Sequence, residues 1–409
     1  MSAEDAVITL VAVVMLAVIV VAANYADRHR SGQMQRAVYG TLILINLLIL
    51  VTYGLAPSAL DENDGIGESE ALGALALAVI VAALASAVLL RRVRQVLMPL
   101  FPRFRGDPGQ ARTAAPRVSD PPAPAALAPD PEGAPLFPQM LNYYTERSAP
   151  PTRPVEAGAV AAPVQDAARD YLRGFNPDST VHTVALVYVI YLLGTQLINF
   201  VLGGGLEGVA ESFAVGLSAW DLLLNALPQV VIPLLGVGLG LRRAWPQIMR
   251  RLGLMRPTLE GIAVSFAVTI GLFIFVTAVS AIWQGLVSAE TFEEQTEASN
   301  ALAESVDTLG LAFLLAATAA VGEEIAFRGA LQPVFGFWPT AILFALTHMQ
   351  YTLTPAALII FGVAIVFGWI RQRFSTTMAI FTHFFYNFIP LALTVALPEE
   401  AFALTLGLF

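Results

Sequence analysis

The chain has 409 residues, of which 56% are hydrophobic and only 13% are charged, and its mean hydropathy is +0.69. Soluble domains are about 45–50% apolar and about 25% charged, so a soluble fold has too little interior for this much apolar surface. The composition therefore excludes an ordinary soluble domain and indicates a membrane protein. The absence of cysteine excludes disulfides, thiolate nucleophiles and cysteine-ligated metals. The net charge of −9 indicates no partner by itself, because the charges lie mainly in predicted loops.

Three apolar runs of about 20 residues come first, at 6–25, 37–56 and 71–90, and each is long enough to cross a bilayer as a helix. Acidic Glu4 and Asp5 stand where a secretory signal carries positive charge, so we expect the first run to be retained as a span. Arginines follow the first and third runs, and an acidic loop follows the second. The positive-inside rule then places the N-terminus outside and the end of the third span in the cytoplasm.

The composition changes over residues 101–170, where Ala114–Pro138 is dense in proline and alanine. Such a segment cannot bury enough apolar surface to fold. We predict a disordered cytoplasmic linker that ends in a short amphipathic segment at Asp166–Leu172; a partner-binding motif is the alternative. The linker divides the chain into an N-terminal three-span region at 1–100 and a membrane domain at 171–409.

Apolar runs resume in the second half, and basic and acidic loops alternate between them as the positive-inside rule requires. Arg371 and Arg373 mark the last of the cytoplasmic turns. The predicted spans are 180–203, 219–241, 259–283, 308–327, 355–370 and 376–397, with a short apolar helix at 338–350. The sequence thus predicts an all-α polytopic bundle of about ten spans.

Two adjacent glutamates lie near the end of the span at 308–327, in the sequence GEEIAFRG that begins at Gly322. A charged side chain at membrane depth is costly unless it faces a partner or water. Glu324 and Arg328 are four residues apart, so an α-helix places them on one face, where they can pair. Glu323 is rotated by about 100° from Glu324 and is free to act as a general base. A salt-bridge cluster at the headgroup level is the alternative interpretation of this motif.

Two of the four histidines, His348 and His383, lie in the apolar runs that follow. If its helix starts near Pro339, His348 lies about 15 Å along it, near the middle of the membrane. His383 and Asn387 are four residues apart and share a helix face, with His383 about 10 Å from the cytoplasmic end. Either histidine alone is also compatible with a purely structural role.

The combination of these groups is more specific than its parts, because three polar sites on three neighbouring helices can meet in one cavity open to the cytoplasm. A carboxylate can take a proton from water, a histidine can position that water, and an asparagine with a second histidine can stabilise an oxyanion. Glu323, His348 and His383 are also ligand types for zinc, which would activate a bound water directly. The chain has no HExxH helix and no GxSxG elbow.

The order EExxxR, FxxxH and HxxxN in apolar helices resembles the CPBP family, the CAAX-protease and bacteriocin-processing or Abi proteins, which include the type II CAAX prenyl endopeptidases. The resemblance covers roughly residues 180–397. It implies an all-helical membrane core whose site opens to the cytoplasm. It also implies a glutamate-dependent peptidase that needs no tightly bound metal, although the family is often called metalloproteases. The N-terminal spans and the linker are additions to a minimal member.

The resemblance carries over to the motif residues one by one. It implies that Glu323 is the water-activating base, that Glu324 and Arg328 complete the first motif, and that His348 works with the base on the water. His383 and Asn387 resemble the oxyanion-stabilising pair. A metal, if bound, would be held by Glu323, His348 and His383.

The residues leave three functions open: an intramembrane endopeptidase, a catalytically silent scaffold or immunity protein that keeps the cluster for folding, and a transporter that uses it as an ion relay. The intact motifs favour the peptidase, and the lack of a clear internal repeat counts against the transporter. We expect a peptide or membrane-associated protein as substrate, the lipid bilayer as surroundings and no nucleic-acid partner. The sequence indicates neither an oligomeric state nor whether a prenyl group is recognised.

Overall fold

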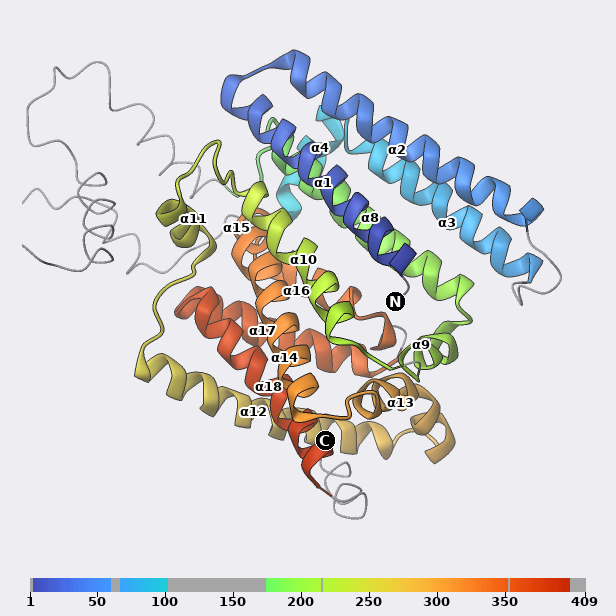
Figure 1. Ribbon diagram of the computed structural model, residues 1–409, viewed down its shortest axis with the longest axis vertical. Coiled ribbons are helices and arrows are strands. Elements are labelled where there is room, and N and C mark those ends of the chain that lie inside the picture. Colours follow the sequence, from blue (N-terminus) through green and yellow to red (C-terminus); the bar gives the residue numbers. More distant parts are fainter. Residues whose placement is uncertain (1–2, 60–66, 102–173, 215, 352–353, 398–409) are drawn as a thin grey trace, which may run out of the picture. The chain divides into compact units, whose positions relative to one another are not determined.

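The computed structural model describes residues 3–59, 67–101, 174–214, 216–351 and 354–397, and every regular element in these ranges is a helix (Figure 1). Nine of the described helices are long and apolar enough to cross a membrane, and Phe337–Leu346 is a shorter apolar helix. The predicted all-α membrane bundle is therefore confirmed. The predicted linker lies outside the described residues except for residue 101, and so does the segment Asp166–Leu172.

The first part of the chain forms α1 (Ala3–His29), α2 (Gly32–Ala59), α3 (Glu68–Ala87), α4 (Arg91–Leu97) and η1 (Met98–Leu100). The middle part forms α8 (Thr180–Leu202), α9 (Gly205–Ala214), α10 (Ala219–Gly236), α11 (Trp245–Leu252), α12 (Leu259–Gln284) and α13 (Ala289–Glu304). The last part forms α14 (Leu309–Glu323), η2 (Glu324–Leu331), α15 (Gln332–Phe335), α16 (Phe337–Leu346), η3 (Met349–Tyr351), α17 (Ala356–Arg373) and α18 (Thr376–Ala396).

Hydroxyl side chains set the start of most of the later helices. At each of these N-caps a serine or threonine oxygen accepts a hydrogen bond from the backbone N–H three residues on, which satisfies a donor that the helix itself leaves free. These residues are Ser179, Ser218, Thr258, Ser288, Thr308 and Ser375. The caps explain why the apolar runs become helices with sharp beginnings.

Helix α14 does not end where the sequence predicts. It continues through η2 and α15, so that one span covers Leu309–Phe335 instead of 308–327. The prediction ended the span at its charged residues, whereas the fold neutralises those charges inside the bundle. Glu323 consequently lies near the middle of the span, about 18 Å from its end at Phe335. Helix α10 differs in the opposite sense, because it ends at Gly236 and the predicted remainder up to 241 is a turn.

The described residues of 1–105 and 173–409 form one compact unit, in which α3 packs on α8 and α1 packs on both α8 and α10. The division into three regions stays a prediction. Polar side chains hold the N-terminal helices to α8. Tyr39 Oη donates to Thr183 Oγ1 (3.2 Å), and Tyr191 Oη donates to Asn46 Oδ1 (2.7 Å). Hydrogen bonds between apolar helices favour one arrangement of the helices, because lipid offers the same groups no partner.

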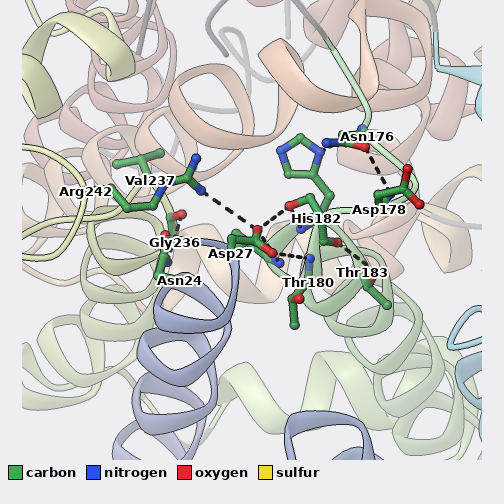
Figure 2. Close-up of polar contacts among 12 residues, drawn as sticks. Asn24, Asp27, Asn176, Asp178, Thr180, His182, Thr183, Gly236, Val237 and Arg242 are labelled. Carbon is green, nitrogen blue, oxygen red and sulfur yellow. Dashed lines mark hydrogen bonds and ion pairs between the residues drawn. The ribbon is translucent and has the colours of Figure 1, made fainter. Parts of the chain in front are cut away.

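A denser polar cluster joins three helix ends (Figure 2). Near the end of α1, Asp27 accepts hydrogen bonds from Ser179 Oγ (2.6 Å) and from the backbone N–H groups of Thr180 (2.7 Å) and Val181 (3.2 Å) at the start of α8. Arg242, in the turn after α10, lies 3.9 Å from the same carboxylate. A carboxylate at a helix N-terminus satisfies free N–H groups and interacts favourably with the helix dipole.

Asn24 completes this cluster one turn earlier on α1. Its side chain is fully buried, and Nδ2 donates to the carbonyl oxygens of Leu235 (2.9 Å) and Gly236 (3.3 Å) at the end of α10. These carbonyls belong to the last turn of the helix, and that of Leu235 also accepts from the backbone N–H of Gly238 in the turn that follows. Helix α1 thus binds the N-terminus of α8 and the C-terminus of α10 at the same end of the bundle, which we call the Asp27 end.

Candidate active site

The first motif lies in a π-helical segment. Glu323 is the last residue of α14, and η2 begins at Glu324 and runs to Leu331. A π-helical turn is wider than an α-helical one, is rare, and occurs frequently at functional sites. Arginines from other helices donate to carbonyl groups of this segment: Arg371 Nε to Arg328 O (3.2 Å) and Arg251 Nη1 to Gly329 O (2.9 Å). These side-chain donors stabilise the irregular backbone inside the bundle.

Glu324 and Arg328 form an ion pair, as the sequence predicts. The atoms Arg328 Nη1 and Glu324 Oε1 are 3.2 Å apart, and both side chains are buried. His383 on α18 is also buried, and its Nδ1 lies 3.0 Å from the same Glu324 oxygen. A carboxylate oxygen accepts, so Nδ1 carries the proton and donates. Glu324 therefore balances the Arg328 charge and orients the His383 ring.

Aromatic rings surround this buried group. The Arg328 guanidinium lies 4.0 Å from the centre of the Phe344 ring and 5.4 Å from that of Phe367. His383 stacks on Phe367 with ring centres 4.7 Å apart. A cation over an aromatic face gains electrostatic energy, and the gain is larger in a site without water. The phenylalanines thus exclude solvent from the charged group and also stabilise its cation.

Glu323 and His348 form a second, more accessible pair. Glu323 Oε2 and His348 Nε2 are 3.9 Å apart, and each side chain is 20% exposed, whereas Glu324 is fully buried. His348 Nδ1 lies 2.8 Å from the carbonyl oxygen of Phe344 and donates to it, because a carbonyl can only accept. Nε2 then faces Glu323, and a separation beyond hydrogen-bond range suits a water between the two side chains.

The sequence predicts His348 inside the short apolar helix at 338–350, and the structure places it beyond the end of that helix. Helix α16 ends at Leu346, and His348 follows in the turn before η3. Gly336, with a φ of +90°, precedes the helix, which starts at Phe337, one residue before the predicted 338. The tertiary position of the histidine is nevertheless close to the first motif, since the Phe344 ring contacts both His348 and His383 with ring centres 4.6 and 6.1 Å apart.

Five of the six predicted site residues lie in three side-chain pairs, two of which share Glu324. The pairs are Glu324–Arg328, Glu324–His383 and Glu323–His348. Asn387 is the exception: it is half-buried one turn beyond His383 on α18, and within the described part of the chain its amide has no hydrogen-bond partner. The conditional zinc ligands are divided between the two pairs, because His383 faces Glu324 and not Glu323. No group of three or more His, Asp or Glu side chains arranged for a metal ion occurs among the described residues.

Several residues that contact the candidate site or the helical segment that carries it were not predicted from the sequence. Phe367 and Gln332 belong to apolar or interfacial stretches and carry no local signal, yet Phe367 stacks on His383 and Gln332 Nε2 donates to Gly368 O (3.1 Å). Gln229 packs against Gly322 from α10. A glutamine inside an apolar run was the one signal that could have singled out Gln229.

Comparison with known proteins bears on this region. Residues 305–389 match a protein-family model whose description is Type II CAAX prenyl endopeptidase Rce1-like. This segment is similar to the Rce1-like domain that the model describes. The matched range contains all three motifs, from Glu323 to Asn387, and the resemblance to CPBP intramembrane endopeptidases is confirmed there. No curated protein and no solved structure matches the chain.

Proposed function

We propose that the Rce1-like domain is an intramembrane endopeptidase in which Glu323 and His348 activate water. The observation that carries the proposal is the arrangement of this pair: the two side chains are partly exposed and 3.9 Å apart, and the direct ion pair of Arg328 is formed with Glu324 instead of Glu323. The Rce1-like match supports a protease of the CAAX type. The proposal adds the mechanism, the roles of the residues and the orientation in the membrane.

In the proposed first step, a water held between Glu323 Oε2 and His348 Nε2 attacks the carbonyl carbon of the scissile peptide bond. Its proton passes to Glu323, and the carbonyl oxygen becomes an oxyanion. In the second step the carbon–nitrogen bond breaks, and the proton on Glu323 moves to the leaving nitrogen. The direct products are a carboxylic acid and an amine; the acid proton then passes to the amine to give a carboxylate and an ammonium group, and Glu323 returns to its initial state. No metal ion is required by this sequence of steps.

His383 and Asn387 stabilise the oxyanion in this mechanism. Glu324 holds His383 through Nδ1, so Nε2 points away from the carboxylate, and its proposed role is to donate a hydrogen bond to the oxyanion. The Asn387 amide supplies a second donor from the next turn of α18.

The proposed orientation puts the Asp27 end of the bundle in the cytoplasm. Arginines concentrate there: Arg91, Arg94, Arg242 and Arg251 all lie at or near helix ends on this side. By the positive-inside rule the N-terminus is outside and the residues 102–173 are cytoplasmic. The protein then lies in a cell membrane with its site open to the cytoplasm.

The test compares purified wild type, Glu323→Gln and Glu297→Gln in detergent. Glu297 is an exposed glutamate of α13 and provides the matched control. The substrates are quenched fluorescent peptides: a farnesylated and an unprenylated CAAX peptide, and a set of apolar peptides. We expect at least one peptide to be cut by wild type and by the control but not by Glu323→Gln, with or without a chelator. Equal cleavage by Glu323→Gln refutes the base, and loss with chelator refutes the metal-free mechanism.

Absence of cleavage of every peptide by a folded wild type would instead favour the non-catalytic scaffold. A proton flux through wild type in vesicles, abolished in Glu323→Gln, would favour the transporter. These outcomes separate the three classes that the sequence leaves open.

A further inference from the structure

Helix α10 carries a glutamine that lies against the residue before Glu323. A Cβ atom built on Gly322 would lie 2.7 Å from Oε1 and 3.1 Å from Cβ of Gln229. Gly322 is buried, so the glutamine occupies space that a larger residue at this position would need. Helix α10 contacts both α14 and η2, which places this contact within the interface to the catalytic span (Figure 1). Gln229 therefore lies beside the backbone that carries the proposed base.

The backbone of α10 is irregular at the same place. Pro228 and Pro233 lie inside the helix. A proline has no N–H group, so Pro233 deprives the carbonyl of Gln229, four residues earlier, of its usual helical donor. The side-chain atom Gln229 Oε1 is also buried and has no hydrogen-bond partner in the described part of the chain. The Gln229 side chain thus places an acceptor without a partner next to Gly322.

The second unsatisfied acceptor in this region belongs to the site itself, because Glu323 Oε2 is also buried without a hydrogen-bond partner among the described residues. Buried acceptors without partners are destabilising, and in native proteins they call for a specific explanation such as a catalytic role. In the proposed mechanism the water supplies the donor to Glu323 Oε2, which leaves Gln229 Oε1 as the acceptor that a ligand with an N–H group would satisfy.

We propose that Gln229 forms a subsite of the peptidase, in which its side-chain carbonyl accepts a hydrogen bond from a backbone N–H of the substrate next to the scissile bond. This inference rests on the proposed endopeptidase function and specifies its substrate contacts. An extended peptide presents such an N–H on each side of the bond that is cut, whatever its side chains are. In the proposed mechanism Glu323 and His348 already hold the water, so the side-chain carbonyl of Gln229 binds the peptide and not the water.

The experiment exchanges single backbone N–H groups of the substrate for ester oxygens. The probe is the quenched peptide that wild type cleaves best, prepared with one amide-to-ester exchange at each non-scissile position within two residues of the cut. Each peptide is cleaved by wild type, by Gln229→Met and by Gln295→Met. Methionine keeps the length of glutamine but has no amide. Gln295 on α13 also has a buried Oε1 without a partner among the described residues, so it is a matched control.

We expect one ester position to lower kcat/KM of wild type and of Gln295→Met by about tenfold, the effect of one lost hydrogen bond to a buried acceptor. Gln229→Met should show the same loss with the all-amide peptide and no further loss with that ester. The two changes would then be non-additive in kcat/KM, which shows that they remove the same contact. A purely structural role of Gln229 does not produce this non-additivity.

Two results overturn the inference. If no ester position affects wild type, no substrate N–H is bound there, whether or not Gln229→Met folds. If Gln229→Met lowers cleavage of every peptide by the same factor, the glutamine acts on the water or on the helix instead. Neither result affects the proposed function, which is tested by the Glu323→Gln comparison on the all-amide peptide. Failure of that comparison removes both proposals.

Discussion

The buried pair of Glu324 and Arg328 allows a prediction in which two substitutions together destabilise less than one of them alone. The two charges are 3.2 Å apart and both side chains are buried. At an effective dielectric constant of 20 their attraction is about 5 kcal/mol. Removing one partner of such a pair costs about 3–5 kcal/mol, because the other charge stays buried without compensation.

Glu324→Gln should be the most destabilising single change, since it removes the counter-charge of Arg328 and replaces the charged acceptor of His383 by a neutral amide oxygen. Arg328→Met should destabilise less, because His383 still donates to Glu324. In the double variant no isolated charge remains, and methionine packs against Phe344 and Phe367 in place of the guanidinium. We expect the double variant to be more stable than Glu324→Gln alone by about 1–3 kcal/mol.

The assay is equilibrium unfolding by titration with sodium dodecyl sulfate, followed by tryptophan fluorescence. Peptide cleavage is measured on the same samples and should stay low in all three variants, because repacking restores stability without restoring the charged site. If the free energies of the two single changes simply add in the double variant, the two side chains do not interact as a pair. The argument from buried charge would then be wrong.

Three further outcomes follow from single contacts. Glu323→Gln should change the free energy of unfolding by less than about 1 kcal/mol, because the side chain is partly exposed and the nearest histidine nitrogen, His348 Nε2, is 3.9 Å from Oε2. Asp27→Ala should destabilise by about 2–3 kcal/mol in the same titration, since three donors at the start of α8 lose their acceptor, and Asp27→Asn should cost less. Gly253→Ala should destabilise by about 2–4 kcal/mol, because φ is +71° and the new Cβ would lie 2.5 Å from Arg371 Cζ; a midpoint unchanged from wild type would contradict the contact.

The existence of the helices and the membership of the site could be predicted because the membrane makes both visible in the sequence. An apolar run of about 20 residues has few alternatives to a spanning helix. A glutamate, arginine or histidine inside such a run needs a partner, because an unpaired polar or charged group is unfavourable at membrane depth. Glu324, Arg328 and His383 are therefore expected to interact with one another. The pairing of Glu324 with Arg328 also follows from their spacing, in a π-helical segment as in an α-helix.

The partners contributed by other helices could not be predicted in this way. From the sequence, Arg371 is interpreted as a residue that marks a cytoplasmic turn. In the structure its side chain is buried against Gly253, and its Nε donates to the carbonyl of Arg328. The positive-inside rule concerns which side of the membrane a charge occupies and does not say whether the charge is packed. The contacts of Phe367 and Gln229 likewise depend on how the helices pack, and no residue spacing along the chain indicates them.

Helix α10 connects α1 to the site through two contacts in its C-terminal half. Its last carbonyls accept hydrogen bonds from Asn24 of α1, and four residues before Pro233 its glutamine lies on Gly322, next to Glu323. Because Pro233 removes a backbone hydrogen bond between these two points, the position of the glutamine depends on packing as well as on the helix itself. The first of the three N-terminal spans therefore packs on the same helix that the proposed substrate subsite uses.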